Sequence, residues 1–135
     1  MQSVVHTWRQ QRTATEPTYV YEGAIFTFGY YVKLAGLETH TLLSEQNAAC
    51  RDTAQPGCDD AMIFYGRNLR GHPAVERVAA IWQAMGQQPD RFWLIFAHVY
   101  EDEDVAMLTL LREQYTVIAT YTGFDAAAYL LQRKL

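Results

Sequence analysis

One uninterrupted apolar segment, Arg91–Ala97 (Arg-Phe-Trp-Leu-Ile-Phe-Ala), constrains the fold of this chain more than any other feature. It has the length of a strand and does not alternate between apolar and polar residues. Strands with this pattern are buried on both faces, as in parallel sheets that are covered by helices on both sides. The segment therefore predicts a layered α/β architecture.

Strand-like and helix-like segments alternate along the rest of the chain, which favours a mostly parallel sheet between helices. Further strands are expected over Thr18–Tyr21, Thr39–Leu43, Ala61–Tyr65, Thr116–Tyr121 and Ala127–Leu131, and helices within residues 1–12, 24–35, 73–85 and 102–114. A short link containing Gly123 joins the last two strands and indicates an antiparallel hairpin. We predict a three-layer, Rossmann-like sandwich with a mostly parallel sheet and an antiparallel C-terminal edge hairpin.

Charge and hydropathy exclude several classes of function. The net charge is −4, and the sequence shows no basic patch of the kind that nucleic acid requires. No apolar run approaches the roughly 18 residues of a membrane-spanning helix. Polar residues interrupt residues 1–12, which therefore have no signal-peptide core. Taken by itself, the chain is expected to be soluble and to bind no nucleic acid.

Two cysteines, Cys50 and Cys58, flank a Pro-Gly turn. They favour a small disulfide loop, which would stabilise the fold by roughly 2–3 kcal/mol and would imply an oxidising compartment. Two unrelated thiols in a loop explain the spacing equally well. A metal site would need more ligands than the nearby aspartates offer, so no metal is expected.

Motifs for nucleotide binding and for nucleophilic catalysis are absent from the sequence. There is no Gly-x-Gly-x-x-Gly loop, no phosphate-binding Gly-Lys-Ser/Thr loop and no Gly-x-Ser-x-Gly elbow. No cofactor and no catalytic residue are therefore predicted.

Polar residues follow three of the expected strands at the edge where parallel α/β sheets bind ligands. Glu22 and Gly23 follow the first strand, Arg67 follows the strand ending at Tyr65, and His98 follows Ala97. These four residues form a candidate edge for a ligand or a partner. The alternative is that they cap helices or bond loops.

Two segments resemble a known family. Tyr19–Ala24 with Phe28–Tyr31 is similar to a Val-Tyr-Tyr-Gly-Ala…Phe-x-Tyr-Tyr stretch, and Arg91–Val99 is similar to an Arg-Val-Trp-Leu-Val-Phe-Ser-His strand. Both occur in the soluble C-terminal domain of bacterial family-39-like membrane glycosyltransferases, which are of the GT-C type and related to protein mannosyltransferases. The similarity spans about residues 17–132.

The resemblance implies a non-catalytic accessory domain for acceptor recognition, docking or support. The parent would be a glycosyltransferase that uses a polyprenyl-phosphate sugar and holds its catalytic carboxylate in the membrane portion. Residues 1–16 would be a helix and linker after a membrane segment, and residues 17–135 a single α/β domain outside the cytoplasm, at the membrane. Its partners would be the membrane portion and a sugar or protein acceptor. The alternative is a freestanding α/β domain that binds a small molecule at the C-terminal edge of its sheet.

Overall fold

The computed structural model describes residues 1–13, 15–34 and 62–135. The expected strand Thr39–Leu43 and the two cysteines, Cys50 and Cys58, lie outside the described residues. The predicted disulfide and its alternative therefore both stay open.

The described elements follow the predicted alternation of strands and helices. In chain order they are α1 (Gln2–Gln11), β1 (Thr18–Val20), the 3-10 turn η1 (Glu22–Ala24), α2 (Ile25–Leu34), β2 (Ile63–Tyr65), α4 (Ala74–Met85), β3 (Arg91–Ala97), α5 (Glu103–Leu111), β4 (Tyr115–Gly123) and β5 (Ala126–Arg133). The ends of α4 match their sequence signals. Pro73 precedes its first residue, and Gly86 ends it with a left-handed φ of 72°.

The five strands form one sheet in the order β2-β1-β3-β5-β4. Strand β1 pairs in parallel with β2 and with β3, whereas β5 is antiparallel to both β3 and β4. Four strands therefore run in one direction, and β5 alone is reversed. This confirms the predicted mixed α/β sheet with an antiparallel hairpin at its C-terminal edge.

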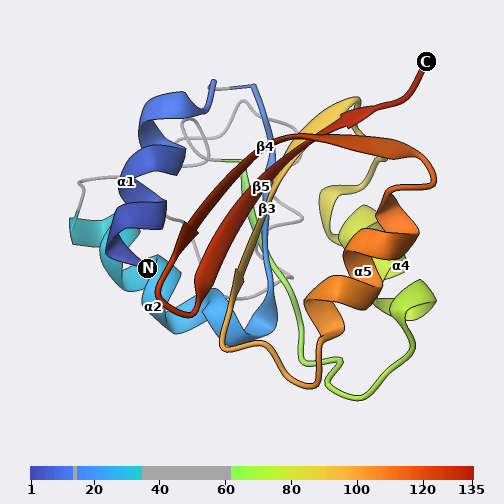
Figure 1. The fold of residues 1–135 in the computed structure, drawn as a ribbon, viewed down its shortest axis with the longest axis horizontal. Coiled ribbons are helices and arrows are strands. Elements are labelled where there is room, and N and C mark those ends of the chain that lie inside the picture. Colours follow the sequence, from blue (N-terminus) through green and yellow to red (C-terminus); the bar gives the residue numbers. More distant parts are fainter. Residues whose placement is uncertain (14, 35–61) are drawn as a thin grey trace.

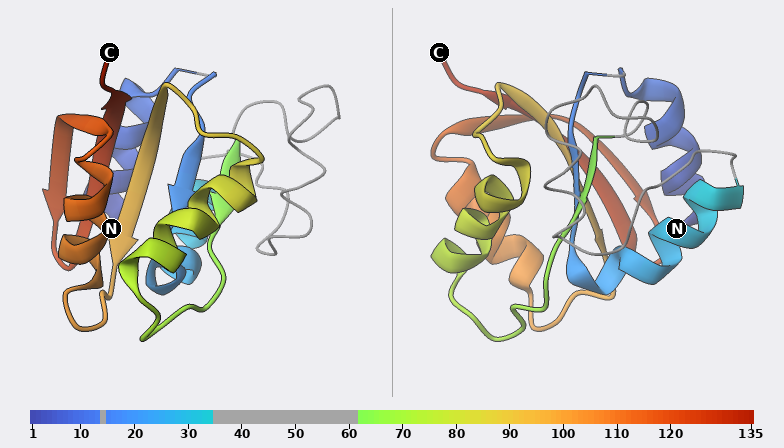
Figure 2. Two further views of the ribbon diagram at one scale, coloured as in Figure 1. Left: turned by 90° about the vertical axis from the view of Figure 1, so that its right-hand side faces the viewer. Right: turned by 180° about the vertical axis from the view of Figure 1, so that it is seen from behind.

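Helices cover both faces of the sheet (Figure 1). Helices α1 and α2 lie on one face, and α4 and α5 lie on the other. The two views of Figure 2 show the same three layers from the side and from behind. Strand β3 lies at the centre, and Phe92–Ala97 are buried on both faces. The continuous apolar run is therefore explained by helices on either side of it.

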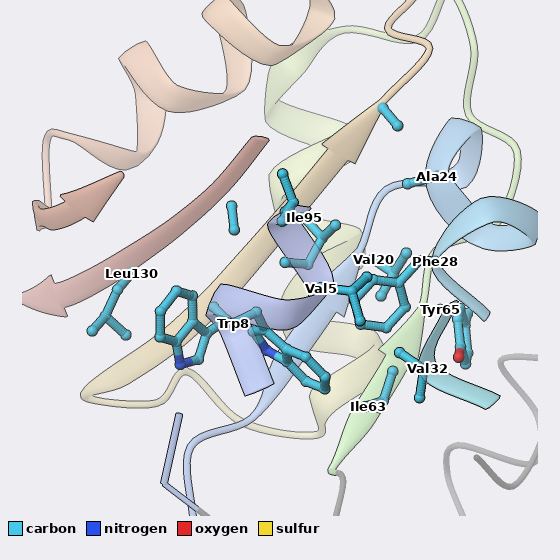
Figure 3. Close-up of a cluster of buried hydrophobic side chains, with 14 residues drawn as sticks. Val5, Trp8, Val20, Ala24, Phe28, Val32, Ile63, Tyr65, Ile95 and Leu130 are labelled. Carbon is cyan, nitrogen blue, oxygen red and sulfur yellow. The ribbon is translucent and has the colours of Figure 1, made fainter. Parts of the chain in front are cut away.

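Helix α1 is part of the hydrophobic core (Figure 3). Val4, Val5 and Trp8 are buried, and they pack in the cluster that contains Phe28 of α2. The Trp8 Nε1 group donates a hydrogen bond of 3.0 Å to Thr18 Oγ1 at the start of β1. The boundary expected at residue 16 stays a prediction, but the helix before it is packed on the sheet.

Helix α2 is less buried than its sequence indicated. The apolar residues within 24–35 lie on nearly all sides of the expected helix and suggest a well-buried one, yet Phe26 is 82% exposed and Tyr30 is 59% exposed. The neighbouring Phe28 is fully buried. The helix therefore packs through one face and is less buried than expected.

In the part of the chain that the structure describes, no helix has the length and apolar character that a bilayer crossing requires.

Candidate functional site

The structure brings the four candidate residues to one edge of the sheet, where β1, β2 and β3 end. Glu22 and Gly23 follow β1, Arg67 follows β2 and His98 follows β3. The three strands are parallel neighbours in the order β2-β1-β3, so their carboxyl ends lie together. The environments of the four residues differ, however.

Glu22 is held in a buried ion-pair network. Its Oε2 atom accepts a hydrogen bond from the Leu69 amide at 2.5 Å, and its Oε1 atom lies 3.5 Å from Nη2 of Arg77. Arg77, on α4, is 4% exposed, and its Nη1 atom lies 2.8 Å from Oε2 of Glu103. One guanidinium thus joins two carboxylates, one from the turn η1 and one from the start of α5. Both carboxylate oxygens of Glu22 therefore have partners within the fold.

The network extends to the end of β1 through Tyr21. The Tyr21 hydroxyl donates a hydrogen bond of 2.8 Å to Oε1 of Glu103, and the Gly71 amide donates one of 3.1 Å to Oε2. Burial raises the pKa of Tyr21, and its hydrogen bond to Glu103 adds to this shift. The network therefore connects the loops after β1, β2 and β3 to one another.

Gly23 closes the crevice between β1 and β3. A Cβ atom there would lie 2.5 Å from the carbonyl oxygen of Ala97 and 2.9 Å from that of His98. Backbone atoms cannot approach a side chain so closely, so this position requires glycine. The crevice where an open α/β sheet would bind a ligand is filled at this point by the chain itself.

Arg67 and His98 are the two candidate residues that stay open to solvent. Arg67 is exposed and makes no ion pair with any described residue. The His98 side chain is 57% exposed, and its Nδ1 atom lies 2.5 Å from Oδ2 of Asp125. Asp125 belongs to the two-residue turn between β4 and β5. It was not a candidate in the sequence, because nothing local connects it to His98.

Unusual backbone conformations gather beside this pair. Among the described residues, five other than glycine have positive φ, and four of these lie after β3 or in the β4–β5 turn: His98 (50°), Glu101 (44°), Asp102 (57°) and Asp125 (50°). Left-handed conformations of this kind cost about 1–2 kcal/mol each. Such strained residues cluster at functional sites, which singles out this end of β3.

A hollow of about 290 Å³ lies next to the strained loop. It is bounded by the end of β3, the start of α5 and the β4–β5 turn. Its lining residues are Phe96, Ala97, Val99, Asp102, Asp104, Thr122, Gly123, Asp125, Ala126 and Ala127. Carboxylates and apolar side chains both face it. His98 is not among the lining residues, although its neighbours in the chain, Ala97 and Val99, and its partner Asp125 are. We call this space the β3-end hollow.

Within the described ranges, no three His, Cys, Asp or Glu residues are grouped so as to hold a metal ion.

Comparisons with known proteins give a distant likeness in structure. No family model matches the chain, and no curated protein matches it significantly. A solved structure that matches is magnesium protoporphyrin IX methyltransferase from Synechocystis PCC 6803 with bound S-adenosylmethionine, at 15% identity and a TM-score of 0.48. The match covers 98% of this chain and 77% of the other.

These comparisons correct the family prediction. The matched protein is a methyltransferase, and nothing points to a GT-C membrane glycosyltransferase. The predicted kinship, the accessory role in such an enzyme and the prediction of a non-catalytic fragment were therefore wrong. The two segments that carried the resemblance form the end of β1 with the turn η1, and β3 with the turn after it. At this TM-score and identity, the similarity to the methyltransferase does not indicate a function for this chain. The predicted partners stay predictions.

Proposed function

We propose that this chain is a small-molecule-binding α/β domain whose ligand occupies the β3-end hollow. The observation that carries the proposal is the position of the hollow, beyond the carboxyl end of the central strand. Ligands of open α/β sheets bind at this edge. The volume of about 290 Å³ is just below the range of roughly 300–1,000 Å³ for small-molecule pockets.

The lining of the hollow supports the proposal. Phe96 and Val99 provide apolar surface, while Asp102, Asp104 and Asp125 provide hydrogen-bond acceptors. A few polar groups on an apolar floor are typical of pockets that orient a small ligand. Two of the carboxylates, those of Asp102 and Asp125, are on left-handed residues, so the chain places them there at a cost in backbone energy.

The test is a ligand screen followed by amide nuclear magnetic resonance on the whole chain. Sugars, amines, amino alcohols and nucleotides are added in turn to ¹⁵N-labelled protein. We expect a binder to shift the signals of Val99, Asp125 and Ala127, which surround the hollow.

Two matched substitutions on β4 decide where the ligand lies. Thr122→Trp fills the hollow, whereas Thr120→Trp places the same ring on the same exposed strand, away from the lining. Ligand-induced shifts should disappear in the first variant and persist in the second. The proposal is wrong if no compound shifts these signals, or if both variants bind equally well.

A further inference from the structure

Strand β4 lies at the edge of the sheet and is paired on one side only. Among the described residues, β5 is its sole neighbour in the sheet, and Figure 2 shows β4 as an outermost strand. Natural edge strands are commonly protected from pairing with another chain by charged residues, by proline or by a bulge. The nine residues Tyr115–Gly123 contain no charge and no proline. Their bulge at Ile118 leaves regular pairing from Ala119 to Gly123. This edge is therefore able to accept a further strand.

The two ends of β4 carry features that fit each other. Phe124, in the turn after its end, is 96% exposed. Gln114 and Tyr115, at its start, line a hollow of about 240 Å³ that we call the α4–α5 hollow. Most of the other lining residues are apolar: Val75, Val78, Ala79, Trp82, Leu110 and Leu111. One copy of the chain thus carries both an exposed aromatic side chain and an apolar space for one.

Antiparallel pairing of two β4 strands joins these two ends. In a two-fold pair, both copies use the same surface, and the end of each strand lies beside the start of the other. Phe124 of each copy then lies next to the α4–α5 hollow of the other copy. The contact is made twice, and the unpaired backbone groups of the two strand edges bond one another.

The charged residues near the two ends favour the same orientation. Basic residues outnumber acidic ones at the start of β4, where the charged residues are Arg112, Arg133 and Lys134 with Asp90 and Glu113. At its end, three aspartates line the β3-end hollow: Asp102, Asp104 and Asp125. The amino group of Met1 is the cation near that end. Antiparallel pairing places the more basic start of each strand beside the more acidic end of the other, which is favourable.

We propose that this chain forms a two-fold dimer in which two β4 strands pair antiparallel and Phe124 of each copy enters the α4–α5 hollow of the other. The two five-stranded sheets become one continuous sheet. The backbone hydrogen bonds provide affinity, and the aromatic side chain in its hollow provides specificity. A membrane surface is a poorer partner for Phe124, because the neighbouring aspartates repel anionic lipids. The dimer needs no ligand and is independent of the proposed function.

Sedimentation velocity of the whole chain measures the dimer directly. We expect the mass to rise from 15.5 kDa towards twice that value as the protein concentration increases. Reducing agent is included so that Cys50 and Cys58 cannot link two copies through a disulfide. A chain that stays monomeric at every concentration overturns the proposal.

Two matched pairs of variants test the contact itself. Phe124→Ser removes the ring, and we expect it to raise the dissociation constant about 100-fold or more, since two rings lose their burial. Phe26→Ser is its control, because Phe26 is 82% exposed on α2. Ala79→Phe fills the α4–α5 hollow and should also weaken the dimer. Gln83→Phe adds the same ring to the exposed face of α4, outside the lining, and should not.

Amide hydrogen exchange tests the pairing of the strands. In the dimer, the amides of β4 that point away from β5 should exchange more slowly, and this protection should increase with protein concentration. The amides of β5 are already paired on both sides and should not change. A dimer that is equally stable in Phe124→Ser and Phe26→Ser overturns the proposal. A dimer without added protection in β4 overturns it as well.

Discussion

The hydroxyl of Tyr21 donates a 2.8 Å hydrogen bond to the carboxylate of Glu103, which is 82 positions further along the chain. The bond joins the end of β1 to the first residue of α5. Glu103 also bonds Arg77 of α4, so a single carboxylate connects three parts of the fold. The loop after β3 joins the same network, because the Tyr100 amide donates a hydrogen bond of 3.4 Å to the Tyr21 hydroxyl.

Arg77→Met tests the contribution of the buried network to stability. The substitution keeps the bulk of the side chain but leaves Glu22 and Glu103 without their shared cation. Loss of one partner from a buried ion pair typically costs about 3–5 kcal/mol. We expect the free energy of unfolding in urea to fall by that amount. Arg67→Met, at an exposed arginine, should change it by less than about 0.5 kcal/mol. If Arg77→Met and Arg67→Met lowered the free energy of unfolding by the same amount, the network would have no structural role.

Gly23→Ala tests the close approach of β1 to β3. The added Cβ atom would meet two carbonyl oxygens, at 2.5 and 2.9 Å, that belong to Ala97 and His98. Because backbone must move to relieve this contact, we expect a loss of about 1–3 kcal/mol. The amide signal of His98 should shift as well. Gly71→Ala is the control. Its φ of 82° is also unfavourable for alanine, but no atom lies within 4 Å of the new Cβ. That variant should lose stability without moving His98.

Local signals were sufficient to predict most of the architecture. The apolar run of β3 indicated a strand covered on both faces, and Pro73 and Gly86 bounded α4. The hairpin followed from a short link between two strand-like segments. In each case a few adjacent residues determine the conformation through burial, φ preference or turn geometry.

The partners at the site could not be predicted in the same way. Glu22 and Arg77 are 55 positions apart, and they meet because β1 and α4 pack at the same edge. Asp125 lies beside His98 because β5, and not β4, pairs with β3. The residue before β5 is therefore next to the residue after β3. A single sequence shows that two strands form a hairpin, but the strand that pairs with β3 is chosen by long-range packing. The candidate His98 was thus identified, whereas its partner was not.

Alkaline pH should destabilise the fold through its buried tyrosines. Burial raises the pKa of Tyr19 above its ordinary value of 10.0, and the nearby Glu22 adds to the shift. The unfolded chain therefore loses this proton first as the pH rises. The stabilisation is complete below pH 10 and is lost progressively above it, by about 1.4 kcal/mol per pH unit for one such group.

Tyr19→Phe removes one of the groups that titrate in this way. Urea unfolding between pH 8 and pH 11 should show a shallower loss of stability for this variant than for the wild type. Tyr30→Phe, at a tyrosine that is 59% exposed, should follow the wild-type curve. Parallel curves for all three proteins would mean that Tyr19 ionises as easily in the folded state as in the unfolded one.

Substitutions of Trp8 test how much the packing of helix α1 contributes to the stability of the fold. Its side chain is fully buried, its Nε1 group bonds Thr18, and its ring meets Phe28 edge-on with centroids 5.1 Å apart. Trp8→Ala should cost about 3–5 kcal/mol, as for other large buried aromatic side chains. Trp8→Phe keeps an aromatic ring but leaves the Thr18 hydroxyl unpaired, and it should cost about 1–3 kcal/mol. Gln10→Ala, on the exposed face of the same helix, should have almost no effect. If Trp8→Ala unfolds at the same urea concentration as Gln10→Ala, the helix is a dispensable extension, and the rest of the fold is stable without it.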